Sequence, residues 1–553
     1  MKKLLFLLLA LALLGTGALA GMRLAQEEPV LALREQLGLG LSEAGEAQIS
    51  VYTEGRLSEA ALRDVKRAAG AFNELAKESM GAGLRQPVKL YVAGTERDYE
   101  KVLAREFELP EAEARQIASI SGGWSGGGRR LTAVNAGAGV MSGTSERTST
   151  TVHELFHQLQ YELSKGHDTD EEALFWLEEG TADYLGAVAA EKLGGKSLAK
   201  WQLDTQMDVL LAHKPVAPEK LLHCTAKDRM ALMGKEYHSY QVADVLTCYL
   251  LNRLSEPQRL PAIAAYFRAL SDGGGGEVAF ERAFGIDLQA FLQEYHVWWA
   301  HFQQAPAAWQ YLAEAGVPEE RQSLLAAQVE KTQAELADKL GAGYQIHGAY
   351  QVVLTADEEG LAEAARKYCE MEAGRAEQLS ANSLGIENGS TLLVNTARLD
   401  DEQQRTLSLS VLLLRTLEGQ YLGRGESRSD IAWLAKGAAY VFGIDVYLEK
   451  IGSRPADYYR NLSRQQRSRS MPEISFLRSE DDYNRLAEIY GAENLSNLTE
   501  LAAYELIRRY GWGAFGRWLS ETRRQQDAEQ AFRAVYGQSS SNFADEFQRQ
   551  LLR

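Results

Sequence analysis

The chain has 553 residues, of which 45% are hydrophobic and 24% charged, so it is globular and long enough to bury large cores. Its formal net charge is −17 and its basic residues are scattered, which argues against a nucleic-acid or anionic-membrane partner. The three cysteines, Cys224, Cys248 and Cys369, are too few for a disulfide framework. Whether Cys224 pairs with Cys248 is left open.

The first twenty residues have the pattern of a secretory signal peptide. Two lysines at positions 2 and 3 precede an apolar run over 4–14, and the small residues at 18–20 form a cleavage pattern. We therefore expect cleavage after Ala20 and export to a periplasm or the extracellular space. An uncleaved anchor is the alternative, although the run is short for a span of ~20 residues. No other stretch is apolar enough to cross a membrane.

The residues that follow predict strands first and helices afterwards. After a polar N-terminal segment (21–46), the expected order is a strand at 47–52, an amphipathic helix at 57–81, a strand at 88–93, a helix near 96–107, the glycine-rich GGWSGGGRR (122–130) and the strand LTAVN (131–135). We expect the glycine-rich segment to be a mobile loop. The pattern is helical from there to about 303. This order predicts an α+β domain over 47–303.

The second half of the chain repeats this order. VKLYVAGTERDYEKVLAREF (88–107) resembles YQVVLTADEEGLAEAARKY (350–368), and FWLEEGTADYL (175–185) resembles AWLAKGAAYVF (432–442). We interpret the pattern as a tandem duplication, with a linker at 304–317 and a second copy at 318–553 that packs against the first. Two unrelated helical domains with common patterns are the alternative.

The segment TVHELFHQLQY (151–161) carries the chemistry. Its apolar residues Val152, Leu155, Phe156 and Leu159 are spaced as one stripe of a helix. His153 and His157 are four residues apart, so both imidazoles project from one face beside that stripe. Two histidines one turn apart can share a metal, and an adjacent carboxylate can take a proton from water. HELFH thus predicts one zinc ion per chain, held by His153 and His157, with Glu154 as general base.

A third zinc ligand is expected further along, because hydrolytic zinc sites have three protein ligands and one open position. Glu179 in FWLEEGTADYL is the candidate, with Glu178 as the alternative. Asp183 is one helical turn after Glu179. A carboxylate there can accept a hydrogen bond from a ligand histidine and fix its tautomer.

HELFH and the downstream WLEEGTADY resemble the gluzincins, the thermolysin-like metallopeptidases, and most closely their peptidase MA-like members. The resemblance covers about 85–300 and implies a zincin-type fold, a small mixed sheet followed by a helical subdomain. It implies His153, His157 and Glu179 as zinc ligands and Glu154 as the base. Asp183 matches the acid that thermolysin-like enzymes place after the third ligand.

The resemblance also implies two further roles. Gluzincins bind the substrate backbone along an edge strand before the HExxH helix, and LTAVN, with Ala133, Val134 and Asn135, has that place. An ordinary structural strand is the alternative. Family members often polarise the scissile carbonyl with a tyrosine or histidine some sixty residues past the third ligand. The candidates here are Tyr237, His238 and Tyr240, and burial in the core is the alternative for Tyr240.

The second copy lacks these groups. At an offset of 258, His153, Glu154 and His157 correspond to Val411, Leu412 and Arg415, and Glu179 corresponds to Lys436, within one residue of register. We therefore expect zinc in the first copy only and a degenerate, non-catalytic second copy.

The sequence hypothesis is an exported zinc metallopeptidase that acts on peptides or proteins. The alternatives are an exported peptide-binding or scaffold pseudopeptidase and a zinc hydrolase of a non-peptide amide.

Overall fold

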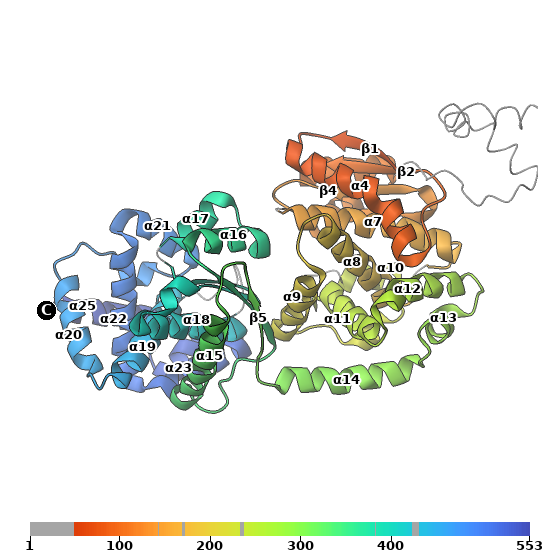
Figure 1. Cartoon of the computed structure of the whole chain (residues 1–553). Coiled ribbons are helices and arrows are strands. Elements are labelled where there is room, and N and C mark those ends of the chain that lie inside the picture. Colours follow the sequence, from red (N-terminus) through yellow and green to blue (C-terminus); the bar gives the residue numbers. More distant parts are fainter. Residues whose placement is uncertain are drawn as a thin grey trace, which may run out of the picture. The chain divides into compact units, whose positions relative to one another are not determined.

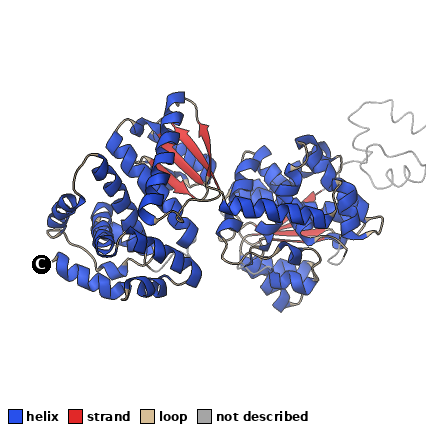
Figure 2. Ribbon diagram, turned by 90° about the horizontal axis from the view of Figure 1, so that it is seen from below, coloured by secondary structure: helices blue, strands red, loops and turns tan. Residues whose placement is uncertain are grey.

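The computed structural model of the chain describes residues 49–552, except for 142, 169–171, 233–236, 382 and 423–430. The predicted signal peptide and the segment 21–46 lie outside the described residues. Helices predominate, and they accompany two small mixed sheets (Figures 1 and 2). The predicted α+β class is confirmed.

The first sheet has four strands in the order β1-β2-β4-β3. The strands are β1 (Ile49–Glu54), β2 (Val88–Ala93), β3 (Gly123–Gly126) and β4 (Leu131–Asn135). β1, β2 and β4 are parallel, and β3 is antiparallel to β4. Parallel neighbours need crossover connections, which α4 (Glu59–Met80), α5 (Glu96–Glu106) and α6 (Glu111–Ile120) supply. β3 is the last strand in the order and pairs only with β4 in this sheet, so it is an edge strand.

Eight helices follow this sheet in the described residues. They are α7 (Thr144–Ser164), α8 (Phe175–Lys192), α9 (Leu198–Leu211), α10 (Ala226–Leu232), α11 (Ser239–Asn252), α12 (Glu256–Leu270), α13 (Gly275–Phe284) and α14 (Leu288–Gln304). α7 packs against α4, α12 and the strands β3 and β4. The active-site helix predicted from HELFH therefore lies directly on the sheet.

The second sheet has the same arrangement, in the order β5-β6-β8-β7 with β7 antiparallel to β8. Its strands are β5 (Ala308–Ala313), β6 (Ala349–Thr355), β7 (Gly385–Asn388) and β8 (Thr391–Asn395). The segment 304–317, predicted to be a linker, contains β5. The sheet of the second half thus begins before the predicted boundary at 318.

The helices of the second half bury the larger of its cores. They are α15 (Glu319–Leu340), α16 (Glu358–Cys369), α17 (Ala373–Ser380), α18 (Glu402–Leu422), α19 (Ala432–Lys450), α20 (Pro455–Gln466), α21 (Glu480–Tyr490), α22 (Ala492–Tyr510), α23 (Trp512–Gln525), α24 (Ala528–Tyr536) and α25 (Ser540–Leu551). α19 packs between α18 and α22, where Leu434, Phe442 and Leu506 are fully buried.

The chain forms two compact units. The first is Met1–Leu174, Thr181–Ala189 and Leu251–Asp287, and the second is Phe175–Gly180, Ala190–Leu250 and Leu288–Arg553. α9 belongs to the second unit because Lys200 donates to Ser390 Oγ (3.1 Å) and Ser390 donates to Asp204 Oδ1 (2.5 Å). Residues 190–250 thus belong to the second unit, although the sequence placed them in the predicted domain 47–303. The predicted domain boundaries stay a prediction.

Close helix contacts recur at matching positions of the two halves. A Cβ on Gly180 would lie 2.5 Å from the carbonyl oxygen of Ala243, and one on Gly437 would lie 2.1 Å from that of Thr499. The ring of Trp176 stacks on Phe291 with 5.6 Å between centroids, and Trp433 stacks on Phe543 at the same distance. Gly437 and Trp433 each follow their counterparts by 257 residues (437 − 180 and 433 − 176), within one residue of the offset of 258 in the predicted repeat.

Cys224 and Cys248 are buried, and both are thiols in the structure. The Cys224 thiol donates to the carbonyl oxygen of Lys220 at 3.2 Å. Among the residues that the structure describes, no helix meets the length and apolarity that a membrane span needs.

Candidate metal centre

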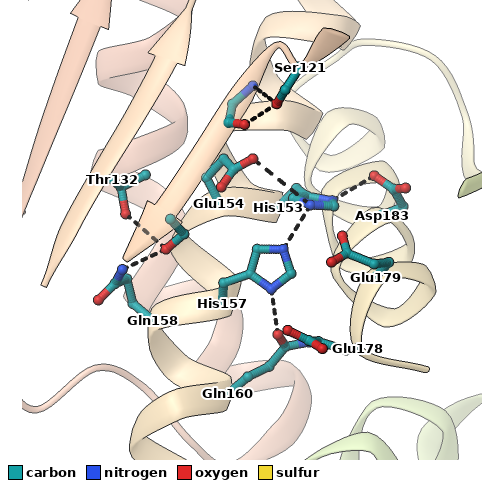
Figure 3. A network of polar contacts seen from close by, with 12 residues as sticks. Ser121, Thr132, His153, Glu154, His157, Gln158, Gln160, Glu178, Glu179 and Asp183 are labelled. Carbon is teal, nitrogen blue, oxygen red and sulfur yellow. Dashed lines mark hydrogen bonds and ion pairs between the residues drawn. The ribbon is translucent and has the colours of Figure 1, made fainter. Parts of the chain in front are cut away.

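The helix α7 presents two histidines at the border of its buried face. Val152, Leu155 and Phe156 are at most 1% exposed, as the predicted stripe requires. His153 and His157 lie beside that stripe, and their rings are 4.6 Å apart and nearly perpendicular. Their Nε2 atoms are 2.9 Å from each other. Two imidazoles one turn apart therefore face a common point (Figure 3).

Each histidine is oriented through its other ring nitrogen. Nδ1 of His153 lies 2.7 Å from Oδ1 of Asp183, and Nδ1 of His157 lies 2.6 Å from Oε1 of Gln160. The Gln160 amide nitrogen donates to Thr181 Oγ1 at 3.2 Å, which leaves its oxygen to accept from His157. An Nδ1–H on each ring leaves both Nε2 atoms as lone pairs. A cation between these two lone pairs, a metal ion or a proton, would hold the nitrogens at the observed 2.9 Å.

The third group is Glu179, the fifth residue of α8 (Phe175–Lys192). One ligand atom each from His153, His157 and Glu179 lies within 4.8 Å of the other two. Two nitrogens bound to zinc at about 2.0–2.1 Å in a tetrahedron lie about 3.3 Å apart, near the observed 2.9 Å. Two histidines and one carboxylate are also a ligand set of hydrolytic zinc sites. These residues fit a zinc ion.

Glu178, the alternative third ligand, is held by a different partner. Both oxygens of its carboxylate accept from the guanidinium of Arg229, and one of these contacts, from Nη1 to Oε1, is 3.3 Å long. Arg229 is on α10, about fifty residues further along the chain. An arginine at such a distance carries no local sequence signal, and our sequence analysis missed it. Gln160, only three residues after His157, was missed for a different reason, because a glutamine in a helix is usually an ordinary surface or core residue.

Glu154 lies beneath the edge strand β3. Its carboxylate is 4.0 Å from Nε2 of His153, and the residue is 5% exposed. A Cβ on Gly123 of β3 would lie 2.3 Å from Glu154 Oε1. Only a glycine at 123 therefore leaves room for the carboxylate. Ser121 braces the same point, because its hydroxyl donates to the carbonyl of Gly123 and accepts from its N–H.

Tyr99 of α5 completes the buried surroundings of this carboxylate. Its ring is fully buried, and burial followed by the nearby negative charge of Glu154 raises the pKa of Tyr99 well above its usual value. Tyr99 is accordingly a neutral phenol, and the charge on this side of the site belongs to Glu154.

The structure corrects the predicted substrate strand. β4 pairs with β2 on one side and with β3 on the other, so Ala133, Val134 and Asn135 lie in the interior of the sheet and are buried. A peptide cannot add to a strand whose two edges are both occupied. The prediction that LTAVN is the edge strand was wrong.

The glycine-rich segment 122–130 supplies the edge instead. It forms β3 and the 3-10 turn Gly127–Arg129, so the prediction of a loop was also wrong. The helix α7 holds this strand through Gln158, whose amide donates to Ser125 Oγ (2.6 Å) and to the carbonyl of Leu131 (3.0 Å). Glycine is rare in strands, which is why the pattern indicated a loop.

The three candidates for polarising a carbonyl lie at the start of α11. Tyr237 is 39% exposed and its carbonyl accepts from the N–H of Val216. His238 has a left-handed backbone, with φ of 50°. Tyr240 is half-buried, with its ring 6.5 Å from that of Phe175. The catalytic role of Tyr237, His238 or Tyr240 stays a prediction.

The second half has other groups at the matching positions. Gly385 of β7 corresponds to Gly123, and a Cβ there would lie 3.0 Å from a methyl of Leu412. A leucine thus has the place of Glu154. Lys436, at the position of Glu179, lies with Nζ 4.3 Å from the ring centroid of Tyr483.

Neither a protein-family model nor a curated protein matches the chain. Among solved structures, it is similar to yeast LTA4 hydrolase in complex with bestatin, with 13% sequence identity and a TM-score of 0.31. The match covers 92% of this chain and 66% of the yeast chain, slightly under two thirds of that protein. A similarity of this size carries no functional argument, so the assignment depends on the site itself.

Proposed function

We propose that the chain is a zinc-dependent metallopeptidase with one active site, in its first half. The observation that carries the proposal is the pair of Nε2 atoms of His153 and His157, 2.9 Å apart, with Glu179 beside them. Both rings are oriented by acceptors on Nδ1, as metal-binding histidines usually are. A zinc ion held by these three residues would supply Lewis acidity and would allow water to act as a nucleophile at neutral pH.

Glu154 is the proposed proton carrier. Its carboxylate is 4.0 Å from His153 Nε2, within reach of a water that occupies the open side of the ligand group. It accepts the proton of that water as the oxygen attacks the peptide carbonyl. It then donates the proton to the leaving nitrogen, so the C–N bond breaks without releasing an amide anion.

The free edge of β3 is the proposed platform for the substrate backbone. It passes over Glu154 and lies at the end of the strand order. A peptide in an extended conformation can pair with such an edge through main-chain hydrogen bonds. This keeps the role that the family resemblance implies and moves it from β4 to β3.

We further propose that the second half is a degenerate copy of the first, exported with it after cleavage near Ala20. The proposal is supported by the matching strand orders, the paired Trp176 and Trp433 stacks and the paired Gly180 and Gly437 contacts. Leucine at 412 removes the base, and the lysine at 436 would repel a cation. One zinc per chain follows.

The test is metal analysis of the purified chain with an activity screen on peptides. Wild type is expected to hold about one zinc per chain. His153→Ala should lose it, whereas His167→Ala, a change at a histidine paired with Glu172 on the surface, should keep it. Glu154→Gln should keep zinc and lose hydrolysis. Zinc-free wild type would refute the proposal.

The outcomes also separate the alternatives. Peptide binding without turnover, equal in wild type and Glu154→Gln, would indicate a peptide-binding pseudopeptidase. Turnover of other amides but of no peptide would indicate a zinc hydrolase of a different substrate class.

A further inference from the structure

Arg229 contacts both acids at the start of α8. Its guanidinium binds the two oxygens of Glu178, and its Nη1 lies 3.6 Å from Oε1 of Glu179. The two glutamates are 8% and 6% exposed, so neither carboxylate is well hydrated. Arg229 thus joins a metal-ligand candidate to its immediate neighbour in the sequence.

The position of this guanidinium is fixed from two sides. Its Cζ lies 4.8 Å from the ring centroid of Phe175, in a cation–π arrangement. α10, which carries Arg229, is capped by Thr225, whose hydroxyl exchanges hydrogen bonds with Asp228. The side chain of Arg229 is 19% exposed. Its planar fork is therefore held with little freedom, as a bidentate pair requires.

Because Glu178 and Glu179 are adjacent and both buried, either carboxylate could bind a metal at this site. Without a cation of its own, Glu178 would be a buried and uncompensated carboxylate close to a divalent ion. A second carboxylate on the metal would fill the open position that hydrolysis needs. A bidentate arginine on Glu178 removes that competition and leaves Glu179 as the carboxylate that faces the histidines.

We propose that Arg229 is a positioning residue that selects Glu179 as the zinc ligand by holding Glu178 in an ion pair. The inference rests on the proposed zinc site. It adds a specific reason why one coordination position of the metal stays open for water. Arg229 acts through Glu178 and does not itself touch the metal.

Cobalt(II) in place of zinc tests the proposal, because its visible absorption weakens as the coordination number rises above four. Wild type is expected to show the strong absorption of a four-coordinate site. Arg229→Gln should lose intensity at unchanged cobalt content, as Glu178 joins the metal. Arg229→Gln combined with Glu178→Gln should restore the wild-type spectrum, since the competing carboxylate is gone.

Two control variants keep the test decisive. Arg282→Gln, which breaks a surface pair with Asp272, should leave the spectrum unchanged. Glu178→Gln alone should also leave the spectrum and the metal content unchanged, and a loss of metal would make Glu178 the ligand and overturn the proposal. This variant shows which glutamate binds the metal even if Arg229→Gln fails to fold.

The remaining outcomes separate the two proposals. An unchanged spectrum in Arg229→Gln, or a double variant that does not restore it, would overturn the selection by Arg229 while leaving the metal site intact. Wild type that binds no cobalt would refute the zinc site itself.

Discussion

Nδ1 of His153 lies 2.7 Å from a carboxylate oxygen of Asp183, one helical turn after Glu179 on α8. The same turn spacing therefore places the carboxylate of Glu179, the proposed zinc ligand, beside that of Asp183 on one helix. α7 uses the same spacing for its two imidazoles. The site is built from two helices whose i and i+4 positions face each other.

Asp183→Asn is expected to weaken zinc binding by about 10-fold, because the neutral amide accepts more weakly from Nδ1–H and reduces the basicity of the ring. Competition with a chromophoric chelator measures the affinity. Asp272→Asn, at a surface acid paired with Arg282, is the control. Equal affinity in wild type and Asp183→Asn would contradict an orienting role for this carboxylate.

Gln160→Met should weaken zinc binding by about 10-fold through the other histidine. Methionine keeps the length of the buried side chain but cannot accept the proton on Nδ1 of His157, which now lies 2.6 Å from the amide oxygen. The same chelator titration applies. Gln160→Glu provides the contrast, because it preserves an acceptor and should retain the affinity better than methionine does.

Gly123→Ala is expected to lower turnover by about 10- to 100-fold without loss of zinc, because the new methyl group displaces the Glu154 carboxylate beneath it. The methyl would lie 2.3 Å from Oε1. Parallel measurements of kcat and zinc content separate the two effects. Gly139→Ala is the matched control, since nothing lies within 4 Å of its added Cβ. Normal turnover in Gly123→Ala would exclude Glu154 as the proton carrier.

The sequence predicted the parts of this site that repeat at helical spacing. The i, i+4 pattern places His153 beside His157 on α7 and Glu179 beside Asp183 on α8. The packing of the two helices, which the structure shows, then brings the two pairs together. Strand order carries no such periodicity. LTAVN has the composition of any buried strand, so only the structure shows that β3 covers one of its sides.

The sequence also could not predict which polar residues pair with each other over long distances along the chain. Arg229 meets Glu178 only because α10 returns to the start of α8, where the N–H of Phe175 donates to the carbonyl of Leu222. No local pattern encodes such a return. The repeat that we propose could, by contrast, be predicted from the sequence, because apolar and glycine positions that pack helices recur with a common spacing, as Gly180 and Gly437 do.

Two buried acids of the second half predict how its stability depends on pH. Burial raises the pKa of Asp445 to about 6, and burial with the charge of Asp445 raises that of Glu500 to about 7. Both groups therefore bind a proton more tightly in the folded chain than in the unfolded chain, where carboxyls titrate near 4. Within the described residues, a hydrogen bond from Trp512 Nε1 to Asp445 Oδ2 at 3.2 Å stabilises the charged form of Asp445.

The sign follows from proton uptake. Between about pH 4 and pH 7 these two carboxyls hold more protons in the folded chain than in the unfolded chain, so their contribution to the free energy of unfolding falls as the pH rises. The loss is absent below about pH 4 and complete above about pH 7, and it is on the order of 2–3 kcal/mol per carboxyl. Urea unfolding at pH 5 and pH 8, followed by tryptophan fluorescence, should show a lower midpoint at pH 8.

The double variant Asp445→Asn and Glu500→Gln removes both titrating groups and should flatten this dependence. Its midpoint at pH 8 is expected to exceed that of wild type, because neutral amides are buried there at lower cost than carboxylates. Asp457→Asn, at an exposed acid paired with Arg460, should leave the slope unchanged. A double variant with the wild-type slope would show that other groups govern the pH response, and that these two acids are charged in the folded chain as well.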